Sequence, residues 1–265
     1  MTTSVVISSF NGQKHLAKNL PAVMALGADE VVIVDDASTD DTVQFLTAKY
    51  PAVKLVRHSR NQRFPITVND GFAAASGDIV FLLNQDVNPQ PDLIKKTLPH
   101  FSNPRVFAVT FNEEGRSWAD GGWVKGFLEF KNGRRDNRIH QSLWASGGSA
   151  AFRKAIWDQL GGFDPIFTPG YFEDLDLGLR AARAGYKILW VPACRVTHTP
   201  ETSFNKAFSP RHLQYFKDRN YLLAMWKNMP PGLWPVHLTT LFGRSLRHPG
   251  FVIPTAWALW KKLAS

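Results

Sequence analysis

The fold is decided at residues 31–40, VVIVDDASTD, where an apolar run ends in two adjacent carboxylates. Residues 81–86, FLLNQD, form another apolar run that ends in an acid, and residues 172–180, FEDLDLGLR, place three carboxylates at the head of a predicted helix. Open α/β sheets bind their ligands outside the carboxyl ends of the strands. Acids at the ends of buried strands therefore predict a site that holds a cation, a proton in transit or a hydroxyl-rich ligand.

On either side of these stretches, predicted strands alternate with predicted helices. Strands are predicted at residues 4–9, 30–34, 53–56, 78–83, 106–110 and 187–191. Helices are predicted at residues 15–24, 38–49, 67–76, 151–160 and 174–184, with another that begins at Pro91. Ser38 and Asp41 form a variant of the capping box at the start of one of them. This alternation is typical of βαβ units, so we expect an α/β fold with a mixed, mainly parallel sheet.

Two regions depart from the alternation and suggest the domain organisation. Residues 113–141 hold charges, glycines and four aromatic residues, and they predict a long loop or a short hairpin of the kind that is often functional. Beyond Pro210 the pattern is helical and rich in Trp, Leu and Arg. We expect a catalytic domain at residues 1–205, divided into halves at residues 1–112 and 113–205, followed by a helical extension at 206–265.

Composition excludes several classes of protein. The 265-residue chain is 44% apolar, which is ordinary for a globular protein with a substantial core. Its single cysteine, Cys194, cannot form an intramolecular disulfide and is predicted to be a small buried residue. No signal peptide is predicted, and no apolar run of roughly 20 residues that could span a bilayer is found in the sequence. We expect a cytoplasmic protein that can also lie on the cytoplasmic face of a membrane.

The formal net charge of +9 permits nucleic acid, an anionic membrane or a phosphate-bearing substrate as a partner. Basic residues cluster at 134–135, 244–247 and 261–262. None of these clusters interleaves with aromatic residues in a nucleic-acid-binding motif, so no nucleic acid partner is predicted.

Motifs spread over residues 4–198 resemble, in their order, the inverting nucleotide-sugar glycosyltransferases of family 2. They are VVISSFNG at 5–12, VDDASTDDT at 34–42, Asn61, Asn69, Gly71, ASGD at 75–78, NQD at 84–86, SGGSA at 146–150, GGFD at 161–164 and FEDLDL at 172–177. Residues 62–65, QRFP, replace the family's usual small residue after Asn61. Asn84 stands where the metal motif usually has Asp, and Asn-x-Asp followed by Val-Asn-Pro is similar to rhamnosyltransferase-type bacterial members.

The resemblance implies a three-layer, Rossmann-like GT-A fold and an activity. A sugar, rhamnose or another hexose, would pass with inversion from a UDP- or dTDP-linked donor to a hydroxyl of a glycan or lipid-linked glycan, in cell-surface polysaccharide synthesis. A leaning toward a deoxysugar follows from the rhamnosyltransferase-like motif. The implied cofactor is Mg²⁺ or Mn²⁺.

Asp174 is the candidate catalytic base. Inversion requires a carboxylate that takes the proton of the acceptor hydroxyl while the oxygen attacks the anomeric carbon. Like charge on Glu173 and Asp176 is expected to raise the pKa of Asp174 and to strengthen it as a base. Glu173 is expected to hold acceptor hydroxyls, whereas Asp176 is expected to be structural. The alternative for all three is an ordinary acid-rich helix N-terminus.

The resemblance assigns the remaining site residues. Asp35 and Asp36 would contact the base and ribose of the nucleotide, with helix capping as the alternative. Asp86 would hold the divalent cation, because Mg²⁺ is typically bound through one or two carboxylates plus substrate phosphates. His198 is either a further metal ligand or a loop histidine. The other donor- or acceptor-binding candidates are Ser9, Asn11, Asn61, Asn69, Asn84, Gln85, Gly147, Gly148 and Arg219.

Other hypotheses stay open beside the transferase. A nucleotidyltransferase would need a glycine- and lysine-rich phosphate loop, which residues 8–12, SSFNG, do not form. A non-catalytic nucleotide-sugar or carbohydrate-binding module would need no base. The segment 233–263 mixes aromatic and basic residues, which suits either a membrane interface or helices that pack back on the domain.

Overall fold

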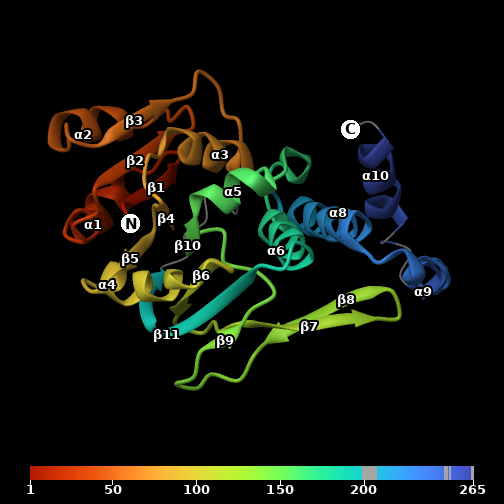
Figure 1. The fold of residues 1–265 in the computed structure, drawn as a ribbon. Coiled ribbons are helices and arrows are strands. Elements are labelled where there is room, and N and C mark those ends of the chain that lie inside the picture. Colours follow the sequence, from red (N-terminus) through yellow and green to blue (C-terminus); the bar gives the residue numbers. More distant parts are fainter. Residues whose placement is uncertain (199–207, 248–249, 251, 264–265) are drawn as a thin grey trace.

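The computed structural model describes residues 1–198, 208–247, 250 and 252–263, and its centre is a nine-stranded sheet (Figure 1). In spatial order the strands are β3 (Lys54–Arg57), β2 (Glu30–Asp35), β1 (Thr3–Ser9), β4 (Ile79–Asn84), β10 (Ser149–Arg153), β6 (Val106–Glu113), β11 (Lys187–His198) and β5 (Val87–Pro89), while β9 (His140–Gln141) pairs with β11. β10, β5 and β9 run antiparallel to their neighbours, and the other strands share one direction. The predicted mixed, mainly parallel sheet is confirmed.

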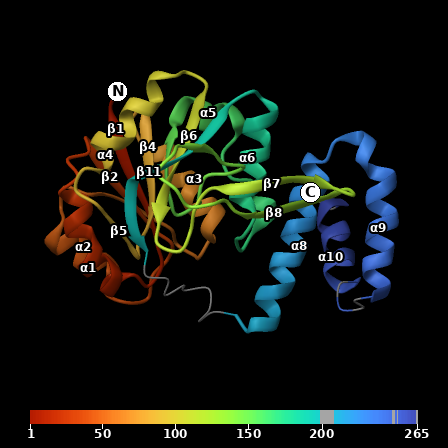
Figure 2. The ribbon, with the colours of Figure 1, turned by 90° about the horizontal axis from the view of Figure 1, so that it is seen from below.

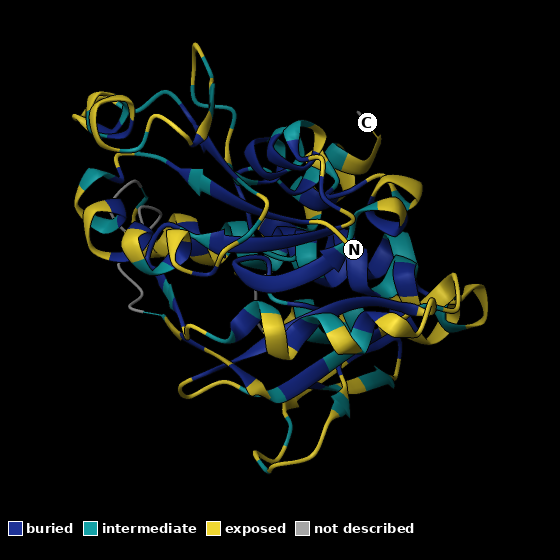
Figure 3. Cartoon of the chain, turned by 60° about the vertical axis from the view of Figure 1, so that its left-hand side comes forward, coloured by how far each residue is buried: buried dark blue, intermediate teal, exposed yellow. Residues whose placement is uncertain are grey.

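Helices cover both faces of the sheet, so the fold has three layers. They are α1 (Gln13–Met24), α2 (Thr42–Lys49), α3 (Phe64–Ala74), α4 (Leu93–Thr97), α5 (Lys154–Leu160) and α6 (Glu173–Arg183). Successive side chains of a strand point to opposite faces. Val5 and Ile7 therefore pack in one core with Leu16 of α1, and Val6 packs in the other with Phe72 of α3. Figure 3 shows the buried strands beneath helices with exposed outer surfaces.

A hairpin and the C-terminal helices share a third core. β7 (Ala119–Val124) and β8 (Phe127–Asn132) extend from the sheet toward the long helix α8 (Pro210–Asn228), and α10 (Val252–Leu263) packs on α8 (Figure 2). α9 (Trp234–Arg247) follows a short 3₁₀ turn, Pro231–Leu233. Phe127 of the hairpin lies in one apolar cluster with Leu222 and Ala258. No helix in the described part of the chain is long and apolar enough to cross a membrane.

The structure differs from the sequence prediction at several element boundaries. β10 occupies residues that were expected to begin a helix, because Ala150, Ala151 and Phe152 fill a gap between β4 and β6 and are buried on both faces. Helix α2 begins at Thr42, whose N–H donates to Asp40 Oδ1 at 3.1 Å. The capping box predicted at Ser38 is wrong, and α4 begins two residues after Pro91.

Candidate active site

Asp35 and Asp36 lie at the end of β2 and differ in their environments. Both oxygens of Asp36 are taken up by protein donors: the N–H of Gln62 lies 2.7 Å from Oδ1, the N–H of Arg63 lies 3.0 Å from Oδ2, and His58 Nδ1 lies 2.8 Å from Oδ1. Asp35 Oδ2 accepts from the N–H of Ser38 at 3.2 Å. Its Oδ1 is buried and has no hydrogen-bond partner among the described residues. Asp36 thus positions the loop at residues 58–63, while Asp35 retains an unused acceptor.

The turns after β1, β2 and β4 are tied together by side chains. Ser9 Oγ donates to Gln85 Oε1 at 2.9 Å, and the N–H of Phe10 donates to the same oxygen at 3.2 Å. Asn11, at a φ of 49°, accepts from the N–H of Thr39 at 2.8 Å through its Oδ1. Ser9 and Gln85 thus bond to each other, and Asn11 bonds to the turn after β2, which fixes the loops that surround Asp35.

Two further predicted asparagines hold backbone in place. Asn61 Oδ1 accepts from the N–H of Arg63 at 3.1 Å. Asn69 of α3 accepts from the N–H of Phe163 at 2.9 Å and donates to its carbonyl at 2.7 Å. Asn69 therefore links α3 to the loop before the second carboxylate cluster, with both ends of its amide used by protein.

Asp86, His198 and Glu113 form a chain of titratable groups at the ends of β4, β11 and β6. His198 Nε2 lies 3.1 Å from Asp86 Oδ1, and His198 Nδ1 lies 3.1 Å from Glu113 Oε2. The hydrogen bonds to the two carboxylates raise the pKa of His198 to about 9. Burial alone would raise the pKa of Glu113, but bonds from His198 and Ser149 and the charge of Arg116 lower it.

Glu113 is a site residue that the sequence reasoning missed. It ends a buried strand in an acid, the same signal that identified Asp35 and Asp86, but residues 113–116 were assigned to the start of a polar loop. Only 3% of Glu113 is exposed, and it also accepts from the hydroxyls of Ser146 and Ser149.

The donor set around Asp86 is chemically suited to a divalent cation. The described residues contain no group of three or more His, Cys, Asp and Glu side chains arranged to enclose a metal ion. Asp86 is a buried carboxylate, and the neutral imidazole of His198, 3.1 Å from it, can serve as a metal ligand. A cation with hard oxygen preference can be held by one such carboxylate together with water and ligand phosphates. Asp86 and His198 thus fit the expected group, with Glu113 as the partner that orients the imidazole.

The loop at residues 146–149 lies between the titratable groups Asp86, His198 and Glu113 and the carboxylate of Asp174. The N–H of Asn84 donates to the carbonyl of Gly148 at 2.8 Å, and any side chain at Gly148 would overlap the Asn84 amide. The N–H of Gly147 donates to Asp174 Oδ2 at 3.3 Å. Gly148 therefore allows backbone to lie directly against Asn84, whereas a Cβ at Gly147 would meet Asp174 Cβ at an ordinary distance of 3.6 Å.

Asp174 and Glu173 open helix α6 after a strained backbone segment. Tyr171 and Phe172 have φ angles of 75° and 71°, which are uncommon for residues with side chains. Burial raises the pKa of Asp174, and the N–H groups of Leu175, at 2.8 Å, and of Gly147 oppose that rise. Burial and the charge of Asp174 raise the pKa of Glu173 well above its usual value, and its Oε2 is buried without a described partner.

Asp176 has the structural position that the sequence predicted. It is fully buried and accepts from Arg180 Nε at 2.8 Å, from Asn228 Nδ2 at 2.7 Å and from Lys227. Arg180 and Lys227 are the cationic partners of Asp176. Burial, and not the like charge expected from Glu173 and Asp176, raises the pKa of Asp174.

Arg219 lies apart from the other candidates, buried in α8. Its Nη2 donates to the carbonyl of Thr168 at 2.5 Å, and its guanidinium lies over the Trp257 ring at 4.4 Å. Burial lowers its pKa to about 10. The neighbouring Asn220 donates to the carbonyls of Phe167, Gly170 and Tyr171 at 2.7, 2.8 and 3.0 Å. Arg219 and Asn220 thus hold the segment that precedes Asp174 through hydrogen bonds to its carbonyls, which is a positioning role for Arg219.

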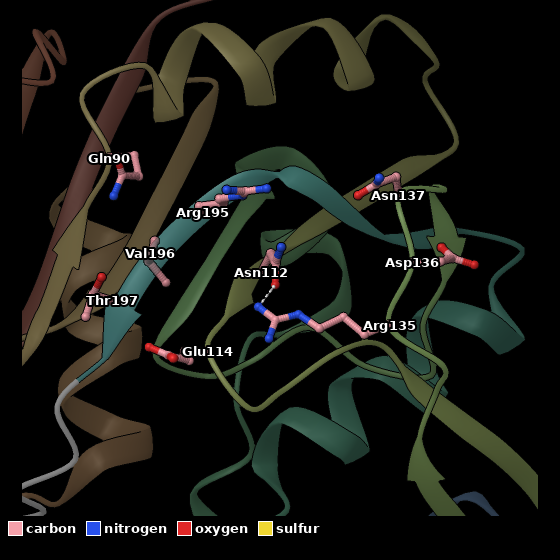
Figure 4. A pocket seen from close by; sticks show the side chains of 9 residues that line it. All are labelled: Gln90, Asn112, Glu114, Arg135, Asp136, Asn137, Arg195, Val196 and Thr197. Carbon is pink, nitrogen blue, oxygen red and sulfur yellow. Dashed lines mark hydrogen bonds between the residues drawn. The ribbon is translucent and has the colours of Figure 1, made fainter.

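A polar pocket of about 430 Å³ lies beside this site but includes none of the predicted residues (Figure 4). It is lined by Gln90, Asn112, Glu114, Arg135, Asp136, Asn137, Arg195, Val196 and Thr197. Arg135 reaches across it and donates to Asn112 Oδ1 at 2.9 Å. Asn112 and Glu114 flank Glu113, and Thr197 precedes His198, so the pocket adjoins the residues suited to a cation.

A three-layer α/β fold with carboxylates at the ends of its strands and at the head of α6 defines a GT-A glycosyltransferase. The chain belongs to glycosyltransferase family 2: residues 2–216 match the family model described as "Glycosyltransferase like family 2". The resemblance noted in the sequence is thus confirmed, and the protein is an enzyme of the transferase class.

Curated relatives include several glycosyltransferases. The chain is 26% identical over 238 residues to the N-acetylglucosaminyl-diphospho-decaprenol L-rhamnosyltransferase of Mycobacterium tuberculosis, a match that covers 73% of this chain and 75% of that protein. It is 31% identical over 132 residues to the dolichol-phosphate mannosyltransferase of Pyrococcus furiosus, with 47% of this chain and 36% of the relative covered.

Solved structures with the same fold include glycosyltransferases crystallised with ligands. The mannosyltransferase PcManGT from Pyrobaculum calidifontis, in complex with GDP-Man and Mn²⁺, has a TM-score of 0.63 at 18% identity and covers 97% of this chain and 74% of its own. GalNAc-T7 with UDP, GalNAc and Mn²⁺ has a TM-score of 0.69 at 19% identity, with 84% of this chain and 47% of its own covered. These likenesses establish the GT-A fold.

Proposed function

We propose that this enzyme transfers one sugar, rhamnose or another hexose, from a nucleoside diphosphate donor to a hydroxyl of a glycan or lipid-linked glycan, with inversion. The proposed setting is cell-surface polysaccharide synthesis at a membrane surface. The rhamnosyltransferase relative supports the sugar and acceptor classes, and the GDP-Man and UDP ligands of the structural neighbours support a nucleotide donor. Family membership favours a transferase over a non-catalytic binding module or a nucleotidyltransferase.

The nucleotide is proposed to bind at the end of β2. The unpartnered Oδ1 of Asp35 suits an N–H of the base or a ribose hydroxyl, because a buried acceptor without a donor carries a desolvation cost that a ligand would remove. Asp36, Asn11 and Gln85 would act by fixing the loops around that position.

Asp86 and His198 are proposed to hold Mg²⁺ or Mn²⁺ on the diphosphate. When bound, the cation would neutralise charge on the departing nucleoside diphosphate. The chain's own part is to present the Asp86 carboxylate, to orient His198 through Glu113, and to keep Asn84 against Gly148 at the edge of the same site.

The observation that carries the proposal is the Asp174 carboxylate. It is held by backbone N–H groups of Gly147 and Leu175, and its raised pKa suits a general base. The acceptor oxygen would bond to the anomeric carbon as the bond from that carbon to the diphosphate oxygen breaks. Asp174 would take the hydroxyl proton, and the nucleoside diphosphate would leave with the bonding electron pair. Glu173 is proposed to hold acceptor hydroxyls beside it.

A donor screen tests this function. Purified protein would be mixed with UDP-, dTDP- and GDP-sugars in Mg²⁺ or Mn²⁺, and thermal shift and nucleoside diphosphate release would be measured. One donor class should stabilise the protein in a metal-dependent way, and NMR of the product should show an inverted anomeric centre. Asp86→Asn should lose the metal-dependent shift, whereas Asp92→Asn, at an exposed carboxylate of a surface ion pair, should keep it. A retained anomeric configuration, or no response to any donor, would contradict the proposal.

A further inference from the structure

The outward surface of α10 is apolar along its whole described length. Residues 252, 256, 259, 260 and 263 recur at the spacing of one helical face. With Ile253 they form the outer face of α10: Val252, Ile253, Ala256, Leu259, Trp260 and Leu263, all of them exposed. Trp260 is 63% exposed and Leu263 is 79% exposed. In a helix of a globular protein, the solvent side is normally the polar side.

Helix α9 carries a second exposed apolar stripe. Leu238, Phe242 and Leu246 recur every four residues, and Phe242 and Leu246 are each 68% exposed. His237 is the one residue of α9 that is buried, and it accepts from Trp226 Nε1 and donates to the carbonyl of Gly126, both at 2.8 Å. Trp234 and Leu241 of α9 also pack against the third core, and Arg244 lies over the Phe127 ring at 3.9 Å. The opposite side of the helix leaves Leu238, Phe242 and Leu246 exposed.

The inner side of α10 explains why the helix does not turn its apolar face inward. Ala258 is fully buried against the third core, and Trp257 stacks on the Arg219 guanidinium. Lys261 Nζ lies 3.3 Å from the carbonyl of Thr168, and burial lowers its pKa to about 8. The inner side thus holds an aromatic ring and a cation in specific contacts, which fixes the outer apolar face toward solvent.

Charge distinguishes among the partners that could cover this surface. Asp218 is the last acidic residue in the sequence, so residues 219–265 contain no Asp or Glu. The same segment carries the exposed Arg247 and Lys262, the latter with its Nζ 5.4 Å from the Trp234 ring. It also carries Arg244, which pairs with Glu129 at 3.6 Å. A second copy would bring like charge against like charge, whereas an anionic surface would be attracted. Nucleic acid would leave the exposed leucines and Trp260 without apolar contacts.

We infer that the outer face of α10 and the stripe on α9 dock this enzyme on an anionic lipid bilayer. Apolar side chains enter the headgroup boundary and basic residues contact the lipid charges, as in interfacial amphipathic helices. Lys261 of α10 and Arg219 of α8, on which α10 packs, hold the segment before Asp174, so docking would place the active site next to the bilayer. The inference concerns binding to lipid and does not depend on the sugar or the acceptor.

Vesicle co-sedimentation of the full chain tests the inference. Wild-type protein should bind vesicles rich in phosphatidylglycerol and bind vesicles of phosphatidylcholine alone more weakly. The double variant Phe242→Ser, Trp260→Ser should weaken binding to the anionic vesicles by roughly tenfold or more, because it removes two inserted side chains. Arg247→Gln should weaken it by roughly fivefold and reduce its salt dependence. All these positions are exposed, and unchanged thermal unfolding would verify that the variants fold.

Matched controls separate docking through α9 and α10 from nonspecific binding of exposed apolar side chains to vesicles. Met24→Ser and Ile139→Ser remove exposed apolar side chains elsewhere and should bind vesicles as the wild type does. The inference is overturned if the wild type binds neither type of vesicle, or if the double variant binds as tightly as the controls. It is also overturned if light scattering shows a dimer that the double variant converts to a monomer, since the face would then join two copies.

Discussion

Asp174 and Glu173 are adjacent acids whose pKa values are both raised by burial, but their hydrogen-bond partners differ. Asp174 has two backbone N–H donors and faces the loop at Gly147. Glu173 has a buried oxygen without a described donor. We therefore predict that Asp174 supports turnover and that Glu173 destabilises the folded protein.

The raised pKa of Asp174 predicts the shape of the pH–rate profile. Below that pKa the carboxyl is protonated and cannot accept a proton, so kcat/KM should rise with pH and level off above it. The acid limb should therefore lie above the usual range of an aspartate. Donor affinity measured over the same pH range would show that binding does not cause the change. A profile that stays flat down to the ordinary aspartate pKa would remove Asp174 as the base.

Glu173→Gln should stabilise the protein at neutral pH. A carboxyl whose folded pKa is raised loses its proton at lower pH in the unfolded chain than in the folded one. Its contribution to stability therefore falls as pH rises through these two values. Removing the charge should raise the free energy of unfolding by about 1 kcal/mol, as measured by urea unfolding at neutral pH. The gain should vanish at acidic pH, where both forms are neutral; a loss of stability at neutral pH would contradict the assignment.

Single residues also show what sequence reasoning can and cannot reach. The strand-end rule pointed to Asp35 and Asp86 because the ends of neighbouring parallel strands meet at one edge of the sheet. It could not say that Asp36 binds the loop at 58–63, because that loop comes back to Asp36 only in the folded chain. Glu113 obeyed the rule, yet it was missed because the polar residues after it hid the end of the strand.

At the scale of elements, α8 positions the segment that carries the proposed base. Asn220→Ala should remove three hydrogen bonds to carbonyls at residues 167, 170 and 171. The bonds hold Tyr171 and Phe172 at positive φ, so their loss should lower kcat more than it raises KM for the donor. It should also destabilise the fold by about 2 kcal/mol. Kinetics and urea unfolding would measure the two effects.

The matched control for Asn220 is Gln214→Ala on the same helix. Gln214 makes one local, exposed hydrogen bond to Asp218, so this change should leave both kcat and stability nearly unaltered. An Asn220→Ala protein with wild-type kcat would show that α8 does not position Asp174.

Elements with strong periodicity were predictable, and β10 was not. Alternating helices and strands in the first half follow directly from apolar spacing. Residues 149–153, SAAFR, carry a short apolar run that fits a strand or a helix equally well. Long-range pairing with β4 and β6 decides the outcome, and no local pattern contains that information.

At the scale of the whole molecule, three apolar cores predict unequal stability. The strands of the sheet are buried between two cores, whereas α9 buries His237 alone. Amide hydrogen exchange should therefore be slowest in β1 and β4 and fastest, among the long helices, in α9. Equal protection of α9 and β1 in exchange mass spectrometry would contradict this picture.

The molecule joins a GT-A scaffold to a helical region with its own surface chemistry. The family motifs end before α9, so the sequence alone left the C-terminal helices open between packing on the domain and contact with a membrane. The folded chain supplies the missing geometry: one side of α10 packs on α8, and the other side exposes apolar residues. The tertiary contacts of Arg219 and Lys261 decide which side of α10 faces inward, and helical periodicity does not encode these contacts.

The central claim is that Asp174 accepts the proton of the acceptor hydroxyl, and Asp174→Asn tests it most directly. Donor affinity and the rate of nucleoside diphosphate release would be measured for this variant beside the wild type, with the donor and cation identified by the screen. We predict that the variant has nearly unchanged donor affinity and releases nucleoside diphosphate roughly 10²- to 10⁴-fold more slowly. A variant that binds the donor and turns over within a few fold of the wild type would contradict it.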